Sequence, residues 1–204
     1  MIYRDLILPH LVHKACSQRH LMKQRRKVVP LAAGEVLELG AGSGLNLPFY
    51  RPDLVKKVWA LEPSPHIWQL GEKERQHLKL DIGYLQSPAE AIPLENRSVD
   101  TVVVTYAFCT IPDVDRALAE ARRVLKNNGT LLFLEHTLAP DPSVRRWQHL
   151  LNPPWRLIGG GCHLNRNIPE IISANGFQLQ DLSCEYLPGW RPASFNCRGA
   201  AVPE

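Results

Sequence analysis

The sequence predicts an α/β fold in which a mostly parallel sheet has helices on both faces. From Gly34 onward, short apolar runs typical of strands alternate with segments typical of helices, which is the pattern of parallel sheets. A glycine-rich loop directly follows the first apolar run, and two consecutive strands are expected near the carboxyl end. With 204 residues, the chain has the length of a single domain with a substantial core.

The chain ahead of Gly34 is predicted to be helical. Its apolar residues recur at helical spacing as far as Ala15, and Pro9 either kinks this helix or marks its start. A second short helix covers residues 18–28 and ends at Pro30. The predicted organisation is an N-terminal helical lid segment over residues 1–33 and one domain over residues 34–204.

The N-terminal segment is also strongly basic, since seven Lys and Arg residues up to Lys27 face a single acid, Asp5. A solvated helix face is the favoured interpretation, and contact with an anionic surface such as a membrane is the alternative. The formal net charge of +4 is too small to predict nucleic-acid binding. The sequence leaves the oligomeric state open.

The cysteines and the apolar runs bear on the compartment. Arg4 and Asp5 interrupt the place where a signal peptide needs an apolar region, and no run approaches the roughly 18 apolar residues of a membrane span. The five cysteines are scattered, and none forms a C-x-x-C pair. We therefore expect a cytoplasmic protein with reduced thiols, without a disulfide framework and without a metal site.

The strands and helices after the lid segment follow from local patterns. Residues 36–39 are a short apolar run that glycines stop, and residues 100–106 are rich in β-branched side chains. The helix over 115–125 is apolar on one face, and Asn127-Asn-Gly129 ends it. The predicted strands cover residues 36–39, 57–61, 82–86, 100–106, 130–135, 177–186 and 194–202, and the predicted helices cover residues 66–80, 115–125 and 168–174.

The loop Gly40-Ala-Gly-Ser-Gly44 is the first candidate for a binding site. Glycines let the backbone turn sharply after a strand and approach a ligand closely. Glycine-rich loops at a strand-to-helix junction commonly bind nucleotides. Taken alone, however, the loop is also explained by a simple tight turn.

Two acidic residues beside the loop narrow the ligand. A carboxylate at Glu38 can pair with the cationic α-amino group of a methionine moiety, directly or through water. Glu62, which ends the second strand before Pro63, can accept hydrogen bonds from both hydroxyls of a ribose. A dinucleotide fingerprint would need glycine where Leu45 stands, and the charge of Glu38 would repel a pyrophosphate. The residues therefore favour a cationic sulfonium cofactor.

From Gly34 to His136 the chain resembles the class I S-adenosylmethionine-dependent methyltransferase family. The likeness includes the glycine loop, Ser87-Pro-Ala-Glu90 and the segment from Asn127 to His136. It implies a Rossmann-like sandwich with a seven-stranded sheet and an antiparallel last strand. It also implies S-adenosylmethionine as cofactor and S-adenosylhomocysteine as product. The family often has an acid where Pro88 stands, so adenine recognition by a side chain is not implied there. The expected cofactor-binding residues are Glu38, Gly40, Ala41, Gly42, Gly44, Asn46, Glu62, Pro63, Ala89, Glu90, Thr105 and Tyr106.

A narrower set of residues is similar to animal methyltransferase-like proteins that methylate alkyl thiols and hydrogen sulfide. This set comprises Gly44-Leu-Asn-Leu-Pro-Phe-Tyr50, Phe108-Cys109, Glu135-His136, Pro153-Pro-Trp-Arg-Leu157 and Gly161-Cys-His-Leu-Asn-Arg166. The resemblance implies a small-molecule acceptor, with a thiol favoured. A lipid- or quinone-type acceptor and a non-catalytic cofactor-binding protein are the alternatives. The animal proteins have a long apolar membrane anchor that this sequence does not show, so membrane association is not implied.

Methyl transfer requires the protein mainly to align the nucleophile, exclude water and manage one proton. A thiol is partly ionised near neutral pH and needs little from a general base. His136, at the carboxyl end of the fifth strand, is the predicted catalytic residue that orients or deprotonates the acceptor, and a purely structural role is the equal alternative. The predicted substrate residues are Cys109, Trp155, Cys162 and Arg166.

Each substrate residue also has a plainer interpretation. Cys109 and Cys162 are either buried bystanders, which is favoured, or ligands for a thiophilic substrate such as arsenite. Arg166 either clamps an anionic substrate group or, slightly favoured, forms an ion pair with Glu170 one helical turn on. Trp155 belongs to a group of late tryptophans that forms either an apolar substrate lid or ordinary core.

Overall fold

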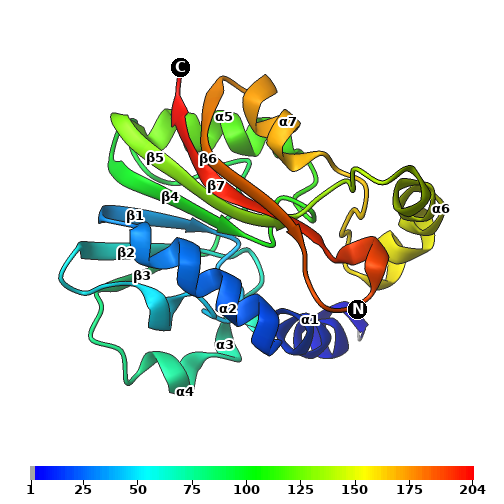
Figure 1. The fold of residues 1–204 in the computed structure, drawn as a ribbon. Helices are drawn as coiled ribbons and strands as arrows, with labels where there is room; N and C mark the ends of the chain where they lie inside the picture. The colour runs from blue at the N-terminus through cyan, green and yellow to red at the C-terminus, as the bar shows by residue number, and fades with distance from the viewer. Residues whose placement is uncertain (1–2) are drawn as a thin grey trace.

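A seven-stranded sheet forms the centre of the molecule (Figure 1). The computed structural model describes residues 3–204, so the first two residues of the predicted lid segment lie outside it, as do the side chains of Arg4 and Asp5. The strand order is β3-β2-β1-β4-β5-β7-β6, and β7 runs opposite to the other strands of this sheet. This confirms the predicted mostly parallel sheet with an antiparallel last strand. The strands are β1 Gly34–Leu39, β2 Val55–Leu61, β3 Ile82–Leu85, β4 Val99–Thr105, β5 Leu125–His136, β6 Phe177–Tyr186 and β7 Phe195–Pro203.

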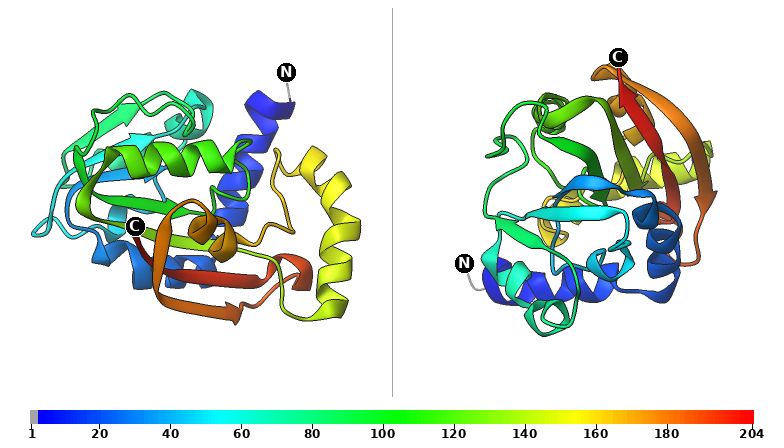
Figure 2. Two further views of the ribbon diagram at one scale, coloured as in Figure 1. Left: turned by 90° about the horizontal axis from the view of Figure 1, so that it is seen from above. Right: turned by 90° about the vertical axis from the view of Figure 1, so that its left-hand side faces the viewer.

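Helices cover both faces of this sheet and its carboxyl-end edge. The α2 helix packs against β5 on one face, and α5 and α7 lie on the opposite face (Figure 1). The α1 and α6 helices lie beyond the carboxyl ends of the parallel strands (Figures 1 and 2). The helices are α1 Leu8–Cys16, α2 Arg19–Val28, α3 Pro65–Gln69, α4 Glu72–Arg75, α5 Val114–Val124, α6 Pro142–Ile158 and α7 Ile168–Ala174, with a π-helical turn over Tyr3–Ile7 and 3-10 turns over Val29–Leu31, Leu47–Phe49 and Arg191–Ala193.

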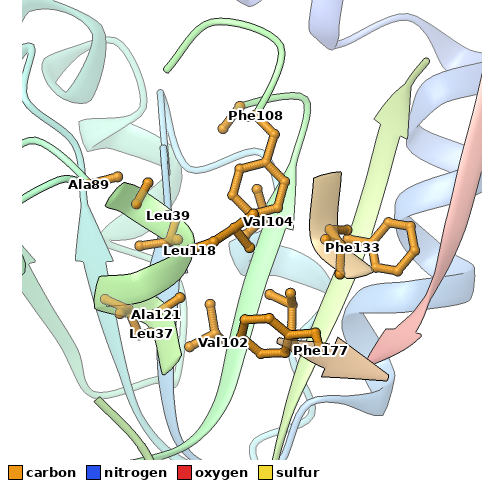
Figure 3. Close-up of a cluster of buried hydrophobic side chains, with 14 of the residues drawn as sticks. Leu37, Leu39, Ala89, Val102, Val104, Phe108, Leu118, Ala121, Phe133 and Phe177 are labelled. Carbon is orange, nitrogen blue, oxygen red and sulfur yellow. The ribbon is translucent and has the colours of Figure 1, made fainter. Parts of the chain in front are cut away.

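Both faces of the sheet are buried. Successive apolar side chains of a strand belong to two different clusters, one on each face. Val102 and Val104 of β4 pack with Leu118 of α5 on one face, as Figure 3 shows. Val103, between them in the chain, packs on the other face with Val28 of α2. Successive side chains of a strand point to opposite faces, so an unbroken β-branched run is what a strand covered on both sides requires.

Three elements differ from the sequence-based prediction. The helix predicted over 66–80 is instead the two short helices α3 and α4, separated at Leu70 and Gly71. A Cβ on Gly71 would lie 1.8 Å from the carbonyl oxygen of Ser43, so this glycine lets the chain abut the glycine loop. The β5 strand begins at Leu125 and includes the Asn-Asn-Gly stretch, with an irregular register against β4.

The 17-residue helix α6 was not predicted at all. Pro153 and Pro154 lie inside it, and proline normally ends a helix because it lacks an N–H group and clashes with the preceding turn. Pro9 marks the start of α1, where it occupies the first turn after the π-helical residues. This settles the two alternatives for Pro9 in favour of a helix start.

The expectation that all five thiols are reduced is wrong for one pair. Cys184 of β6 and Cys197 of β7 face each other in the sheet register and form a disulfide. The pairing depends on how two antiparallel strands align, which the scattered positions in the sequence do not reveal. Cys16, Cys109 and Cys162 are free thiols. Within residues 3–204, none of the helices is both long and apolar enough to span a membrane.

Candidate functional site

The glycine loop turns the chain at the carboxyl end of β1. Gly40 has a φ of +64°, and a Cβ at this position would lie 2.6 Å from the Cβ of Ala107, which follows β4. Only glycine therefore allows the loop to pass between β1 and β4 at this point. The strand order reverses between these two strands, and open α/β sheets bind ligands in the crevice at such a point.

A cavity of about 680 Å³ opens at this crevice. Its size is within the usual range for small-molecule sites. Nine of the twelve predicted cofactor residues line it: Gly40, Ala41, Gly42, Glu62, Pro63, Ala89, Glu90, Thr105 and Tyr106. The three that do not are Glu38, Gly44 and Asn46.

Glu62 lies at the wall of this cavity and is 7% exposed. Its Oε2 accepts a hydrogen bond from the N–H of Gly42 at 3.0 Å, and its Oε1 accepts one from the N–H of Ser64 at 2.8 Å. Burial raises the pKa of this carboxyl, although both amide hydrogen bonds act in the opposite direction. The side chain thus holds the glycine loop, and each carboxylate oxygen keeps a further lone pair for a ligand.

Glu38 lies behind the cavity wall and is only 1% exposed. It accepts hydrogen bonds from Nδ2 of Asn46 at 2.9 Å and from the hydroxyl of Tyr50 at 2.7 Å. Burial raises the pKa of Glu38 to about 7. A direct contact between Glu38 and a methionine amino group is therefore not available in this arrangement, and any influence has to pass through its neighbours.

Arg25 of α2 completes this network, and sequence reasoning missed it. It lines the cavity at 4% exposure, and its Nη1 donates to Oδ1 of Asn46 at 2.7 Å and to Oγ1 of Thr105. Its guanidinium carbon lies 5.2 Å from the ring centre of Tyr106, within the range of a cation–π contact. The available signal was the i, i+3 spacing of Arg25 and the core residue Val28, which places both on the buried face of α2.

A second cavity of about 490 Å³ adjoins the first. Both are lined by Leu8, Val12, Cys16, Tyr106, Thr110 and Gly159, so the two spaces meet at the end of β4. Tyr106 itself has a φ of +56°, an uncommon conformation for a non-glycine residue. We call this second space the acceptor cavity, because residues predicted from the sequence to contact the methyl acceptor line it.

The acceptor cavity is mainly apolar and lies between the N-terminal helices, α6 and the chain before β7. Trp155 of α6 and Trp190 line it, with their ring centres 5.1 Å apart. Of the residues predicted for substrate and catalysis, Cys109, His136, Trp155 and Cys162 line this cavity. Sequence reasoning therefore named four side chains that the fold brings together.

The substrate role predicted for Arg166 is corrected by its position. Its Nη1 donates to the carbonyl oxygens of Phe108 and Ile111, the latter at 2.7 Å, and it lines neither cavity. The described ion pairs do not include one between Arg166 and Glu170, and Nδ2 of Asn167 donates to the Glu170 carboxylate at 2.6 Å. Buried carbonyl groups need partners, and the guanidinium of Arg166 supplies them.

Glu135 supports the same segment from the other side. Its Oε1 accepts hydrogen bonds from the N–H groups of Ala107 at 2.6 Å and Phe108 at 2.9 Å. Burial raises the pKa of Glu135 to about 7. Glu135 and Arg166 together therefore hold the turn after β4, which carries Cys109 to the acceptor cavity.

Cys109, His136 and Cys162 form a compact cluster at this turn. The Nε2 of His136 lies 3.2 Å from Sγ of Cys162, and the donor atoms of all three residues lie within 4.8 Å of one another. A hydrogen bond with Cys109 lowers the pKa of Cys162 to about 4, against the effect of burial and with help from His136. The pKa of Cys109 is raised, first by the same hydrogen bond and then by burial. Burial alone would lower the pKa of His136, but the nearby Cys162 raises it overall.

Comparisons with known proteins agree with this geometry. Residues 37–133 match the family described as a methyltransferase domain. The chain is 32% identical to human thiol S-methyltransferase TMT1B, with 97% of this chain and 83% of that protein aligned. It is 27% identical to demethylmenaquinone methyltransferase of Thermus thermophilus over 75% of this chain and 74% of that protein.

The fold is similar to a solved structure of an S-adenosylmethionine-dependent methyltransferase from Thermotoga maritima. The TM-score is 0.70 at 18% identity, and the match covers 100% of this chain and 98% of the other. At this identity the likeness concerns the fold alone.

Proposed function

Because the chain belongs to the class I S-adenosylmethionine-dependent methyltransferases, we propose that its two adjoining cavities serve methyl transfer to a small thiol. The observation that carries this proposal is their junction at Tyr106 and Thr110, which line both spaces. A nucleophile in one cavity can thus face a group held at the end of the other. In-line displacement needs this alignment above all.

The first cavity suits the cofactor in size and in the polar groups that it offers. Nε of Arg25 and the hydroxyl of Tyr106 are buried without a hydrogen-bond partner in the described part of the chain. Buried polar atoms of this kind usually have a partner, so a polar ligand at this end of the cavity is favoured. S-adenosylmethionine, when bound, supplies the electrophilic methyl group.

We assign the cofactor contacts from these positions. Glu62 accepts hydrogen bonds from the ribose hydroxyls, and the chain at Ala89 and Glu90 borders the adenine. Arg25 attracts the methionine carboxylate. Glu38 acts on the methionine amino group only through Asn46, which it orients by hydrogen bonding.

A thiol is the favoured acceptor because human TMT1B, which shares 32% of its residues over most of this chain, is a thiol S-methyltransferase. The apolar wall at Trp155 and Trp190 fits the hydrocarbon part of a small alkyl thiol. Nε2 of His136 lies 3.2 Å from Sγ of Cys162, so this ring nitrogen is already engaged within the cluster. His136 is thus better suited to orient the acceptor than to remove its proton.

A quinone-type acceptor is the second candidate. The specific observation is a row of exposed apolar side chains beside the acceptor cavity, at Leu11 of α1 and Leu157 and Ile158 of α6. Large apolar molecules are commonly recognised by such surfaces. The Thermus thermophilus relative, a demethylmenaquinone methyltransferase, belongs to this chemical class by its name.

The test is S-adenosylhomocysteine formation with ethanethiol, a water-soluble quinol, a phenol and an amine as acceptors. Ala15→Trp narrows the acceptor cavity, which Ala15 lines without reaching the cofactor cavity. We expect turnover with ethanethiol and, in Ala15→Trp, a raised thiol KM with unchanged affinity for S-adenosylhomocysteine. Leu54→Trp, at an exposed position outside both cavities, is the matched control. Turnover with the quinol and none with the thiol would transfer the assignment to the second candidate.

A further inference from the structure

We infer that Cys109, His136 and Cys162 form a binding site for a soft divalent metal ion, with Zn²⁺ as the expected ion. These residues come from three separate parts of the fold: the turn after β4, the end of β5 and the loop after α6. Two thiols and one imidazole are the donors that zinc prefers, and no hard-cation donor belongs to the cluster. This replaces the expectation from the sequence that the chain lacks a metal site.

The spacing of the donor atoms suits a single ion. In a tetrahedral zinc site, Zn–S distances of about 2.3 Å and Zn–N distances of about 2.0–2.1 Å separate the donors by roughly 3.5–3.8 Å. Here the three donors lie within 4.8 Å of one another, and the Nε2–Sγ distance is 3.2 Å. Small side-chain shifts would therefore bring all three onto one ion.

The backbone around the cluster is already held in place. The N–H of His163 donates to the carbonyl oxygen of Cys109 at 2.7 Å, which ties the two cysteine-bearing segments together. His136 is paired with Asn196 in the register of β5 and β7. Metal sites depend on such support, because loosely held ligands lose affinity.

The fourth coordination position opens on the acceptor cavity, since all three residues line that cavity. Three protein ligands with one open position are the pattern of catalytic zinc, whereas structural zinc is enclosed by four. This part of the inference rests on the proposed function: the sulfur of the acceptor thiol would occupy the open position.

The chemistry balances without a further reactant. Coordination of the acceptor thiol releases its proton to solvent, because a metal-bound thiol is deprotonated. The thiolate electron pair then forms the new S–CH₃ bond, and the bond from the sulfonium sulfur to the methyl carbon breaks. The electron pair of this broken bond stays on the sulfur of S-adenosylhomocysteine. The charge of the thiolate and that of the sulfonium cancel in this transfer, so the thioether is neutral and leaves the site.

The first experiment measures metal binding without cofactor or acceptor. Protein whose three free thiols are reduced and whose disulfide is intact is titrated with Zn²⁺ in competition with a chromophoric chelator. The wild type is compared with Cys109→Ser, Cys162→Ser and His77→Ala. We expect one ion per wild-type chain. In the first two variants the metal affinity should fall by more than about 100-fold, since removing a ligand lowers affinity more than removing a group that only supports a ligand. His77 is an exposed imidazole outside the cluster and outside both cavities, so His77→Ala should bind as the wild type does.

Melting curves of each variant check that binding is compared between folded proteins. The site is refuted if the folded wild type takes up no stoichiometric ion, or if His77→Ala weakens binding as much as Cys162→Ser does.

The second experiment tests the open position with Co²⁺ as a spectroscopic substitute. Thiolate-to-cobalt absorption bands should appear in the wild type and shift when ethanethiol is added. Bands that do not shift would refute the fourth-ligand part. Turnover of the thiol by metal-free protein would refute the metal's role while the proposed function stands. Metal binding without thiol turnover would refute the proposed function, while the metal site itself would stand.

Discussion

Replacing Glu62 with alanine tests the assignment of the cofactor cavity most directly. Both carboxylate oxygens already accept one backbone N–H each, from Gly42 and Ser64, and each keeps capacity for a ribose hydroxyl. In Glu62→Ala these hydroxyls lose a charged acceptor at the buried wall of the cavity. We therefore expect weaker binding of both S-adenosylmethionine and S-adenosylhomocysteine.

The size of the loss follows from the hydrogen bonds involved. A hydrogen bond to a charged group contributes about 1.5–3 kcal/mol. Water can partly replace the lost acceptor in the space that alanine leaves, so we expect about 1.4–3 kcal/mol in total, which is about 10- to 150-fold in Kd. The same substitution leaves the N–H groups of Gly42 and Ser64 without their acceptor, so the free energy of unfolding should fall by about 1–3 kcal/mol.

Isothermal titration calorimetry with S-adenosylhomocysteine measures the affinity, and urea unfolding measures the stability. Glu62→Gln keeps one acceptor oxygen and nearly the same volume, so its Kd should lie between the wild type and Glu62→Ala. Glu95→Ala removes an exposed carboxylate of the same charge and should leave Kd unchanged. A folded Glu62→Ala protein whose Kd stays within about twofold of the wild type would refute the assignment of Glu62 to the ribose.

Two further predictions concern groups behind the cavities. Burial raises the pKa of Glu38 to about 7, so the folded state holds its proton while the unfolded state releases it near pH 4.5. The free energy of unfolding of the cofactor-free protein should thus fall by about 1–3 kcal/mol as pH rises from about 4.5 to about 7. Urea unfolding at pH 5 and pH 7.5 measures this fall, which should be smaller in Glu38→Gln. A fall of the same size in Glu38→Gln would mean that other groups cause it. Arg166→Lys cannot bond to all the carbonyl groups that Arg166 holds, so its melting temperature should fall by several degrees with little change in thiol KM. A raised KM at unchanged stability would instead restore the substrate role.

The structure also changes what removal of the N-terminal segment would do. The sequence predicts a helical lid over residues 1–33, and a segment that only covered the acceptor could be removed without loss of cofactor affinity. Arg25 lines the cofactor cavity, and Val28 and Val29 are buried in the core. Deletion of residues 1–33 would therefore expose apolar core and remove a cavity wall, so point substitutions such as Ala15→Trp are the sharper probe.

The parts of the site that the sequence by itself determined are local. The glycine loop and Glu62 lie within one strand-loop-strand stretch, and parallel strands bring their carboxyl ends to one edge of the sheet. Local spacing thus sufficed to place these residues beside one cavity, and the β-branched run of β4 sufficed to predict a strand buried on both faces. The charges beside this loop favoured a cationic sulfonium cofactor, and the resemblance to the methyltransferase family implied S-adenosylmethionine.

Only the tertiary structure decided which distant segments meet. Arg25 reaches Thr105 across 80 residues of chain, and Cys184 finds Cys197 through the register of β6 and β7. Cys109, His136 and Cys162 converge from three segments because Glu135, Arg166 and a backbone hydrogen bond hold the intervening turns. Such contacts depend on how helices and strands pack, and no periodicity within one segment records that packing.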